Sequence, residues 1–212
     1  MLPLAVCQAQ IDHTFVNMEI ASGGLLPYQS VRELDAKHES IKGDVYLYEQ
    51  WSECDVKLKG NEKMVRVMAN FNLRNVTLEI LVKQSIYILD RNRVDYVVPG
   101  ARDAEAVRFV DGYGICEVIS GKDPGVFRSH SVSLKKANYN PSHDVGNRFD
   151  EWIKKEELLI SSNGNYYKAG RKKTLLKKMS QDMDIPKEAT NLLSNKPDES
   201  ELISFVSRLS QR

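Results

Sequence analysis

Residues 44–82, DVYLYEQWSECDVKLKGNEKMVRVMANFNLRNVTLEILV, contain the pattern that decides the fold. From Asp44 onward apolar and polar residues alternate, and a period of two is typical of β-strands with one buried face. The apolar positions are Val45 and Leu47, Val56 and Leu58, Val65 and Val67, and the run from Val76 to Val82. This stretch therefore predicts the start of an antiparallel sheet.

Strand signals continue to residue 134. Short β-branched runs alternate with Gly, Pro and Asp turns, which is typical of an antiparallel meander. We therefore predict a mainly β protein, folded as an antiparallel sandwich or an open barrel, with the β-rich domain over residues 44–170. The additional strands are expected at Ile86 to Leu89, Val94 to Val98, Val107 to Val110, Ile115 to Ile119 and Val126 to Leu134.

The last 50 residues change from strand to helix signals. Asn163-Gly164 lies between two apolar runs, and this dipeptide predicts a two-residue β-hairpin turn. Beyond it, apolar residues recur at helical spacing behind an Asp198-to-Glu201 cap. We predict a small α-helical C-terminal segment over residues 171–212, with an apolar stripe formed by Leu175, Met179, Leu202, Phe205, Val206 and Leu209.

The first ten residues, MLPLAVCQAQ, resemble the last part of a secretory leader. Small residues precede a cut after Ala9, so residues 1–9 are predicted to be a signal-peptide remnant and residues 10–43 an N-terminal segment with a short helix after Ser30. We therefore expect an exported protein, periplasmic or surface-associated. Two alternatives stay open: a lipid anchor through Cys7, or a cytoplasmic protein whose first strand is this apolar run.

Charge and hydropathy exclude several broad classes of function. Thirty Lys and Arg stand against 29 Asp and Glu, a formal charge of +1, which gives no global basis for nucleic-acid binding. No uncharged apolar run approaches the roughly 20 residues that a spanning helix needs, so we expect no transmembrane segment.

Catalytic, cofactor and metal motifs are not recognisable. There is no Gly-x-Ser-x-Gly elbow, and strand alternation places His130 on the opposite face from Ser129 and Ser131. Gly112-Tyr113-Gly114 lacks the third glycine of a phosphate cradle. Metal binding would need clustered ligands, but the histidines are scattered at His13, His38, His130 and His143. We predict no catalytic residue, no cofactor and no metal site.

One basic cluster stands out. Six cationic residues fall within eleven positions with no acid among them, and such a local field suits anionic lipid, glycan or nucleic acid. The alternative is the solvated face of a helix that buries Leu175 and Met179. The possible anionic-surface contact consists of Lys168, Arg171, Lys172, Lys173, Lys177 and Lys178.

Cys54 and Cys116 would be the two cysteines left after removal of the leader. In an oxidising compartment we predict a possible disulfide between them, because both share a strand face with core residues. The alternative is two separate buried thiols that act as small hydrophobes.

Several segments together resemble a known family. They are Gly43 to Tyr48 leading to Trp51, Phe71-Asn72-Leu73, Asn138-Tyr139-Asn140-Pro141 with Asp144-Val145-Gly146, and the Asn163-Gly164 hairpin running into Lys172-Lys173. The chain resembles, over roughly residues 43–210, a family of uncharacterised exported β-rich proteins widespread in Bacteroidota. The family has a Tyr-Asn-Pro and Asp-Val-Gly loop and a lysine-rich helical tail. The resemblance implies export and no particular activity.

These observations favour a non-catalytic envelope protein that binds a protein, glycan or lipid partner through the β-domain or the basic tail, with no nucleic acid expected. Two other functions stay open. One is a hydrolase of envelope polymers whose residues meet only in space, and the other is a β-barrel that binds an apolar ligand in an enclosed pocket.

Overall fold

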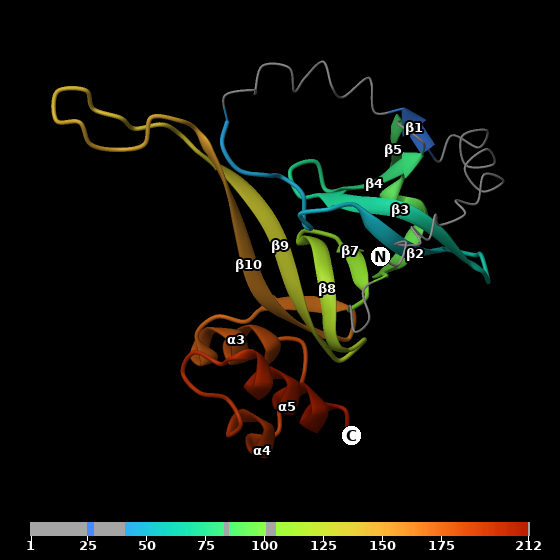
Figure 1. The fold of residues 1–212 in the computed structure, drawn as a ribbon. Helices are drawn as coiled ribbons and strands as arrows, with labels where there is room; N and C mark the ends of the chain where they lie inside the picture. Colours follow the sequence, from blue (N-terminus) through green and yellow to red (C-terminus); the bar gives the residue numbers. More distant parts are fainter. Residues whose placement is uncertain (1–24, 28–40, 83–84, 101–104, 212) are drawn as a thin grey trace, which may run out of the picture. The chain divides into compact units, whose positions relative to one another are not determined.

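The computed structural model describes residues 25–27, 41–82, 85–100 and 105–211. Its chain forms two compact units, the first made of residues 1–104 and 132–153 and the second of residues 105–131 and 154–212. Antiparallel strands dominate the described residues, and three short helices follow them (Figure 1). The predicted class, mainly antiparallel β with a small helical C-terminal segment, is therefore confirmed. The predicted leader and the predicted helix after Ser30 lie outside the described residues.

The first unit is built on a sheet with an open strand order. The order is β1-β5-β4-β3-β2-β6, and each neighbouring pair is antiparallel. A 3-10 turn at Arg91–Arg93 joins β5 to β6 where the sequence predicted a turn, and the Asp90 carboxylate caps it. In sequence order, the strands are β1 (Leu25–Pro27), β2 (Ser52–Leu58), β3 (Met64–Asn72), β4 (Thr77–Val82), β5 (Ser85–Leu89) and β6 (Val94–Pro99).

The segment predicted as the first strand forms only a bridge. Tyr46 pairs with Asn72 in an antiparallel bridge, with backbone bonds from Leu47 N to Phe71 O (2.9 Å) and from Leu73 N to Val45 O (2.8 Å). The Tyr46 hydroxyl also donates to the buried carboxylate of Glu79 at 2.7 Å. Side-chain contacts as well as backbone pairing therefore hold this segment against β3 and β4.

The strands of the second unit follow the order β7-β8-β9-β10-β11, and three helices come after the last strand. The end of β9 from residue 132 and the start of β10 up to residue 153 belong, with the loop between them, to the first unit. Figure 1 shows these helices gathered together beside β11. None of the described helices has the length and apolar character needed to cross a membrane. The elements are β7 (Val107–Val110), β8 (Gly114–Gly121), β9 (Gly125–Lys135), β10 (Glu151–Ser162), β11 (Asn165–Lys168), α3 (Lys172–Met179), α4 (Lys187–Thr190) and α5 (Glu199–Leu209).

The helices are held by the apolar stripe that the sequence predicted. Asp198 and Glu201 form the capping box of α5, because each side chain accepts from the other's backbone N–H. Behind this cap, the buried side chains of α3 and α5 pack with sheet residues Val126, Ile160 and Tyr167. Helix residues in this core are Leu175, Met179, Ala189, Leu202, Phe205, Val206 and Leu209.

The predicted Asn-Gly hairpin joins β10 to β11. Asn163 and Gly164 have φ values of 52° and 75°, so both adopt the left-handed backbone conformation. Two-residue hairpin turns with this conformation at both positions match the twist of the antiparallel strands that they join. A Cβ at Gly164 would meet nothing within 4 Å, so its role is conformational.

Replacing Gly164 with alanine should therefore lower the free energy of unfolding by about 1 kcal/mol, which is the cost of holding an L-residue in the left-handed region. Urea unfolding followed by circular dichroism measures this loss. Asn163→Gly is the matched control, because glycine accepts this backbone conformation. A larger loss of unfolding free energy in Asn163→Gly than in Gly164→Ala would contradict the conformational role of Gly164.

Candidate functional site

The six predicted cationic residues lie at the end of β11 and along α3, but two of them have structural partners. Lys168 forms an ion pair with Glu157 across the hairpin. The Lys172 ammonium donates to Leu193 O at 2.7 Å, and its backbone N–H donates to Asn195 O at 2.9 Å. Lys168 and Lys172 therefore have their donors engaged within the second unit, although Lys168 itself is exposed.

The other four cations, Arg171, Lys173, Lys177 and Lys178, are exposed. Leu175 and Met179 point into the core, so α3 has an apolar inner face and a basic outer face. Within the described part of the chain none of these four makes an ion pair. Asp182, which is close to them in sequence, instead accepts a hydrogen bond from Tyr167 at 2.7 Å.

Cys54 and Cys116 are free, buried thiols, one in each compact unit. Burial raises the pKa of both, and that of Cys116 reaches about 12, so neither carries thiolate at neutral pH. The Cys54–Cys116 disulfide stays a prediction.

Alkylation of the folded protein, read by peptide mass spectrometry, should label Cys54 and Cys116 slowly, because the reactive thiolate is scarce and inaccessible. After unfolding without a reductant, both free thiols should be labelled fully. The exposed thiol of a small peptide gives the reference rate. Peptides joined through Cys54 and Cys116 in the unreduced sample would instead establish the disulfide.

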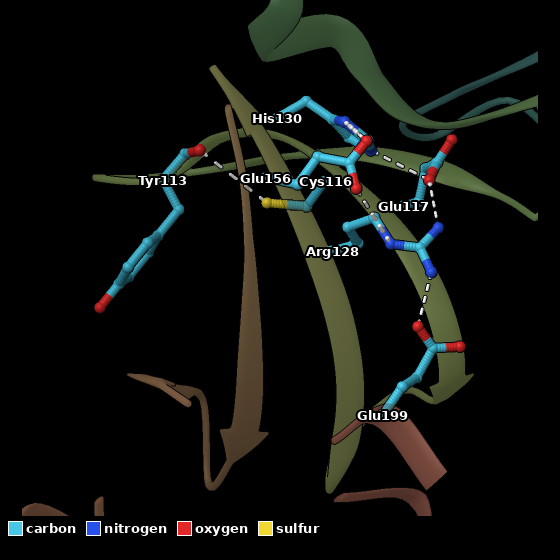
Figure 2. Close-up of polar contacts among 7 residues, drawn as sticks. All are labelled: Tyr113, Cys116, Glu117, Arg128, His130, Glu156 and Glu199. Atoms are coloured by element: carbon cyan, nitrogen blue, oxygen red, sulfur yellow. Dashed lines mark hydrogen bonds and ion pairs between the residues drawn. The ribbon is translucent and has the colours of Figure 1, made fainter. Parts of the chain in front are cut away.

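A polar cluster in the second unit was not predicted from the sequence. In the β8–β9 register Glu117 lies opposite Arg128, and His130 follows on the same face. His130 Nε2 lies 2.9 Å from Glu117 Oε2, and its Nδ1 lies 3.6 Å from Glu156 Oε1. Arg128 joins the cluster to the start of α5 through Glu199, at 2.5 Å, as Figure 2 shows.

Burial strengthens the interactions between the charged side chains of this cluster. The side chains of His130 and Glu117 are 7% and 16% exposed. The hydrogen bond with His130 and the charge of Arg128 hold the pKa of the Glu117 carboxyl below its usual range. Burial raises the pKa of nearby Glu105, whose buried Oε2 has no hydrogen-bond partner in the described chain.

The cluster places the His130 imidazole between two carboxylates, but neither Cys116 nor Ser129 lies on its side of the sheet as a nucleophile. Cys116 is next to Glu117 in sequence, yet it points the other way, toward Tyr113 O (Figure 2). The Ser129 hydroxyl also donates to Tyr113 O, at 2.8 Å, on the face opposite His130. Within the described residues no group of three or more His, Cys, Asp or Glu side chains is arranged to hold a metal ion. The cluster therefore joins β8, β9 and α5.

A third feature is the loop between β9 and β10, residues 136–150, which we call the hairpin loop. It ends a long β-hairpin in Figure 1. Hydrogen bonds within the loop fix its backbone, including Asn140 N to Val145 O at 2.8 Å and Asn138 N to Asn147 O at 3.0 Å. A connection of this length that has an ordered conformation is usually functional.

Polar and aromatic side chains stiffen the hairpin loop further. Asp144 accepts from the Tyr139 hydroxyl at 2.7 Å and from Arg148 at 2.8 Å, and these two bonds lower its pKa. The Arg148 guanidinium also lies 4.6 Å from the centre of the Tyr139 ring.

The same loop exposes apolar surface. The side chains of Val145 and Phe149 rank among the exposed large hydrophobic residues, at 57% and 47%. Gly146, next to Val145, has a φ of +96°, and a Cβ there would lie 2.5 Å from Asn138 O. The loop backbone therefore needs glycine in order to present Val145 in this position.

Comparison of the chain with protein-family models, with curated proteins and with solved structures gives no match. The resemblance to the exported family stays a prediction. The candidate sites therefore rest on the geometry of this chain: the hairpin loop of the first unit, and the exposed cations of α3 and the Glu117–His130–Arg128 cluster of the second.

Proposed function

We propose that this chain is a non-catalytic interaction protein of a bacterial cell envelope and binds a protein partner through the hairpin loop. The observation that carries the proposal is the exposure of Val145 and Phe149 on a backbone fixed by hydrogen bonds. Apolar side chains held in a rigid loop lose little conformational entropy when a partner covers them, so they favour binding. The leader-like N-terminus and the family resemblance support the envelope location.

The polar groups of the loop suit a protein partner. Tyrosine and arginine are, with tryptophan, the residue types that most often contribute strongly to protein interfaces, and Arg148 here donates to the Tyr139 hydroxyl. The Lys42 ammonium lies 4.5 Å from the centre of the Phe149 ring and supports this ring from one side. The loop therefore exposes apolar side chains together with polar and aromatic ones, a combination that protein interfaces share.

Photo-crosslinking in the native cells tests this function. The full chain carries a photoreactive amino acid in place of Val145, and in a second strain in place of Met64, another exposed hydrophobic residue, on β3. We expect one discrete adduct from position 145 and none from position 64. Equal crosslinking patterns at the two positions would refute the proposal.

The purified partner then allows a quantitative test. Phe149→Ser should weaken binding of that partner by roughly 30-fold, which corresponds to about 2 kcal/mol for a residue at an interface centre. Met64→Ser should leave the affinity within two-fold. If Phe149→Ser has no larger effect than Met64→Ser, the hairpin loop is not the binding element.

A further inference from the structure

We propose that the basic outer face of α3 docks the protein on an anionic lipid bilayer, an activity that goes beyond protein binding by the hairpin loop. The face consists of Arg171, Lys173, Lys177 and Lys178, and we call it the basic face. These side chains belong to the second unit, whereas the hairpin loop belongs to the first. The two proposals can therefore fail separately.

The basic face keeps its positive charge available to a partner. Its four cations are exposed, and none has an ion-pair partner among the described residues. Leu175 and Met179, both nearly inaccessible to solvent, anchor the helix in the core of the second unit. The cations are thus presented on a fixed helix, and a negatively charged surface is the partner that complements them.

An exposed apolar residue lies beside the start of the same helix. The segment 191–196 contacts the first turn of α3, because Lys172 donates to Leu193 O and to Asn195 O. In this segment Leu192 is 41% exposed and Lys196 is also exposed. An exposed leucine in a segment that contacts a basic helix favours a bilayer surface, where the headgroups attract the charges and an apolar side chain can enter the interface.

Nucleic acid is another polyanion that a basic face can bind, and the chain suits it less well. Binding of single strands depends on aromatic rings that stack with bases. Phe205 is the only aromatic residue in the sequence from Lys172 onward, and its side chain is buried. The near-zero net charge of the chain also provides no extended basic track for a duplex. A lipid surface needs neither feature.

Vesicle co-sedimentation of the full chain tests this inference. We expect binding to vesicles of phosphatidylcholine with 30% phosphatidylglycerol and none to pure phosphatidylcholine, with affinity falling as salt rises. Each cation near the surface contributes a factor of about five. The variant K173Q/K177Q/K178Q should therefore bind roughly 100-fold more weakly, and Leu192→Ser about five-fold more weakly.

The matched control removes the same charge elsewhere. Lys59, Lys63 and Lys122 are exposed lysines outside the helices, so K59Q/K63Q/K122Q should change vesicle binding less than three-fold. Circular dichroism checks that both triple variants fold, and the hairpin-loop variant Phe149→Ser should bind vesicles normally. Equal losses in both triple variants, equal binding to the two vesicle types, no binding to either, or tighter binding to a DNA oligonucleotide than to vesicles would overturn the inference.

Discussion

Replacing Phe205 with alanine should lower the free energy of unfolding by about 4 kcal/mol, because the change removes a fully buried ring and leaves a cavity. Phe205 lies at the centre of the contact between α5 and the sheet of the second unit, together with Leu175, Leu202 and Ile160. The helical signal in circular dichroism measures this loss during urea unfolding. The two tryptophans, Trp51 and Trp152, belong to the first unit, so their fluorescence follows that unit separately.

Ser207→Ala is the control, since Ser207 is exposed on the same helix. It should alter stability by less than about 0.5 kcal/mol. A truncation that removes residues 202–212 deletes four buried apolar side chains at once and should destabilise the second unit by several kcal/mol. Unchanged unfolding after this truncation would show that α5 is not packed on the sheet.

Replacing Arg128 with leucine should cost roughly 2 kcal/mol at pH 7, because the carboxylates of Glu117 and Glu199 lose their shared cation. Arg128 is 29% exposed, so water compensates for part of the lost interaction. Chemical unfolding of wild type and variant at several pH values measures the difference.

The pH dependence of this stability loss shows whether Arg128 acts through its charge. Hydrogen bonding to His130 and the charge of Arg128 lower the pKa of Glu117 in the folded protein, so its ionised form stabilises the fold above the unfolded pKa. This contribution is lost as the pH falls through the lower folded pKa. The cost of Arg128→Leu should therefore shrink in acid.

Arg66→Leu is the matched control, because Arg66 pairs with Asp55 on an exposed strand face. Its unfolding midpoint should change little at any pH. A cost of Arg128→Leu that stays constant down to pH 3 would show that the Arg128 side chain acts by packing rather than by charge.

Elements that depend on interactions between near neighbours could be predicted from the sequence, whereas contacts between distant segments could not. Alternation placed the strands from Val56 to Leu134, and the Asn163-Gly164 pair placed the second hairpin, because both patterns report interactions between near neighbours. The start of β10 was missed. Residues 151–157, EWIKKEE, lack alternation, and this part of the strand is mostly half-buried or exposed.

The same distinction between local and distant interactions applies to the candidate sites. The cations at the end of β11 and on α3 are contiguous, so the sequence by itself identified them as a candidate site. The Tyr139-to-Gly146 motif entered only through the family resemblance, without a binding role. The sequence did not show that Lys168 and Lys172 have partners, nor that the hairpin loop is fixed with Val145 exposed. Lys168 pairs with Glu157 only because β10 and β11 form a hairpin, and Lys172 has acceptors only because segment 191–195 lies against α3. The exposure of Val145 depends on the hydrogen bonds that join the two sides of the hairpin loop.

The Glu117–His130–Arg128 cluster was decided by tertiary structure alone. Strand alternation correctly separated His130 from its neighbouring serines, but it did not give the partner of His130. That partner depends on the β8–β9 register, in which Glu117 lies opposite Arg128, and on the position of Glu199 at the start of α5. A shift of one residue in that register would move Glu117 to the other face of the sheet, so only the assembled strands and helix bring these charges together.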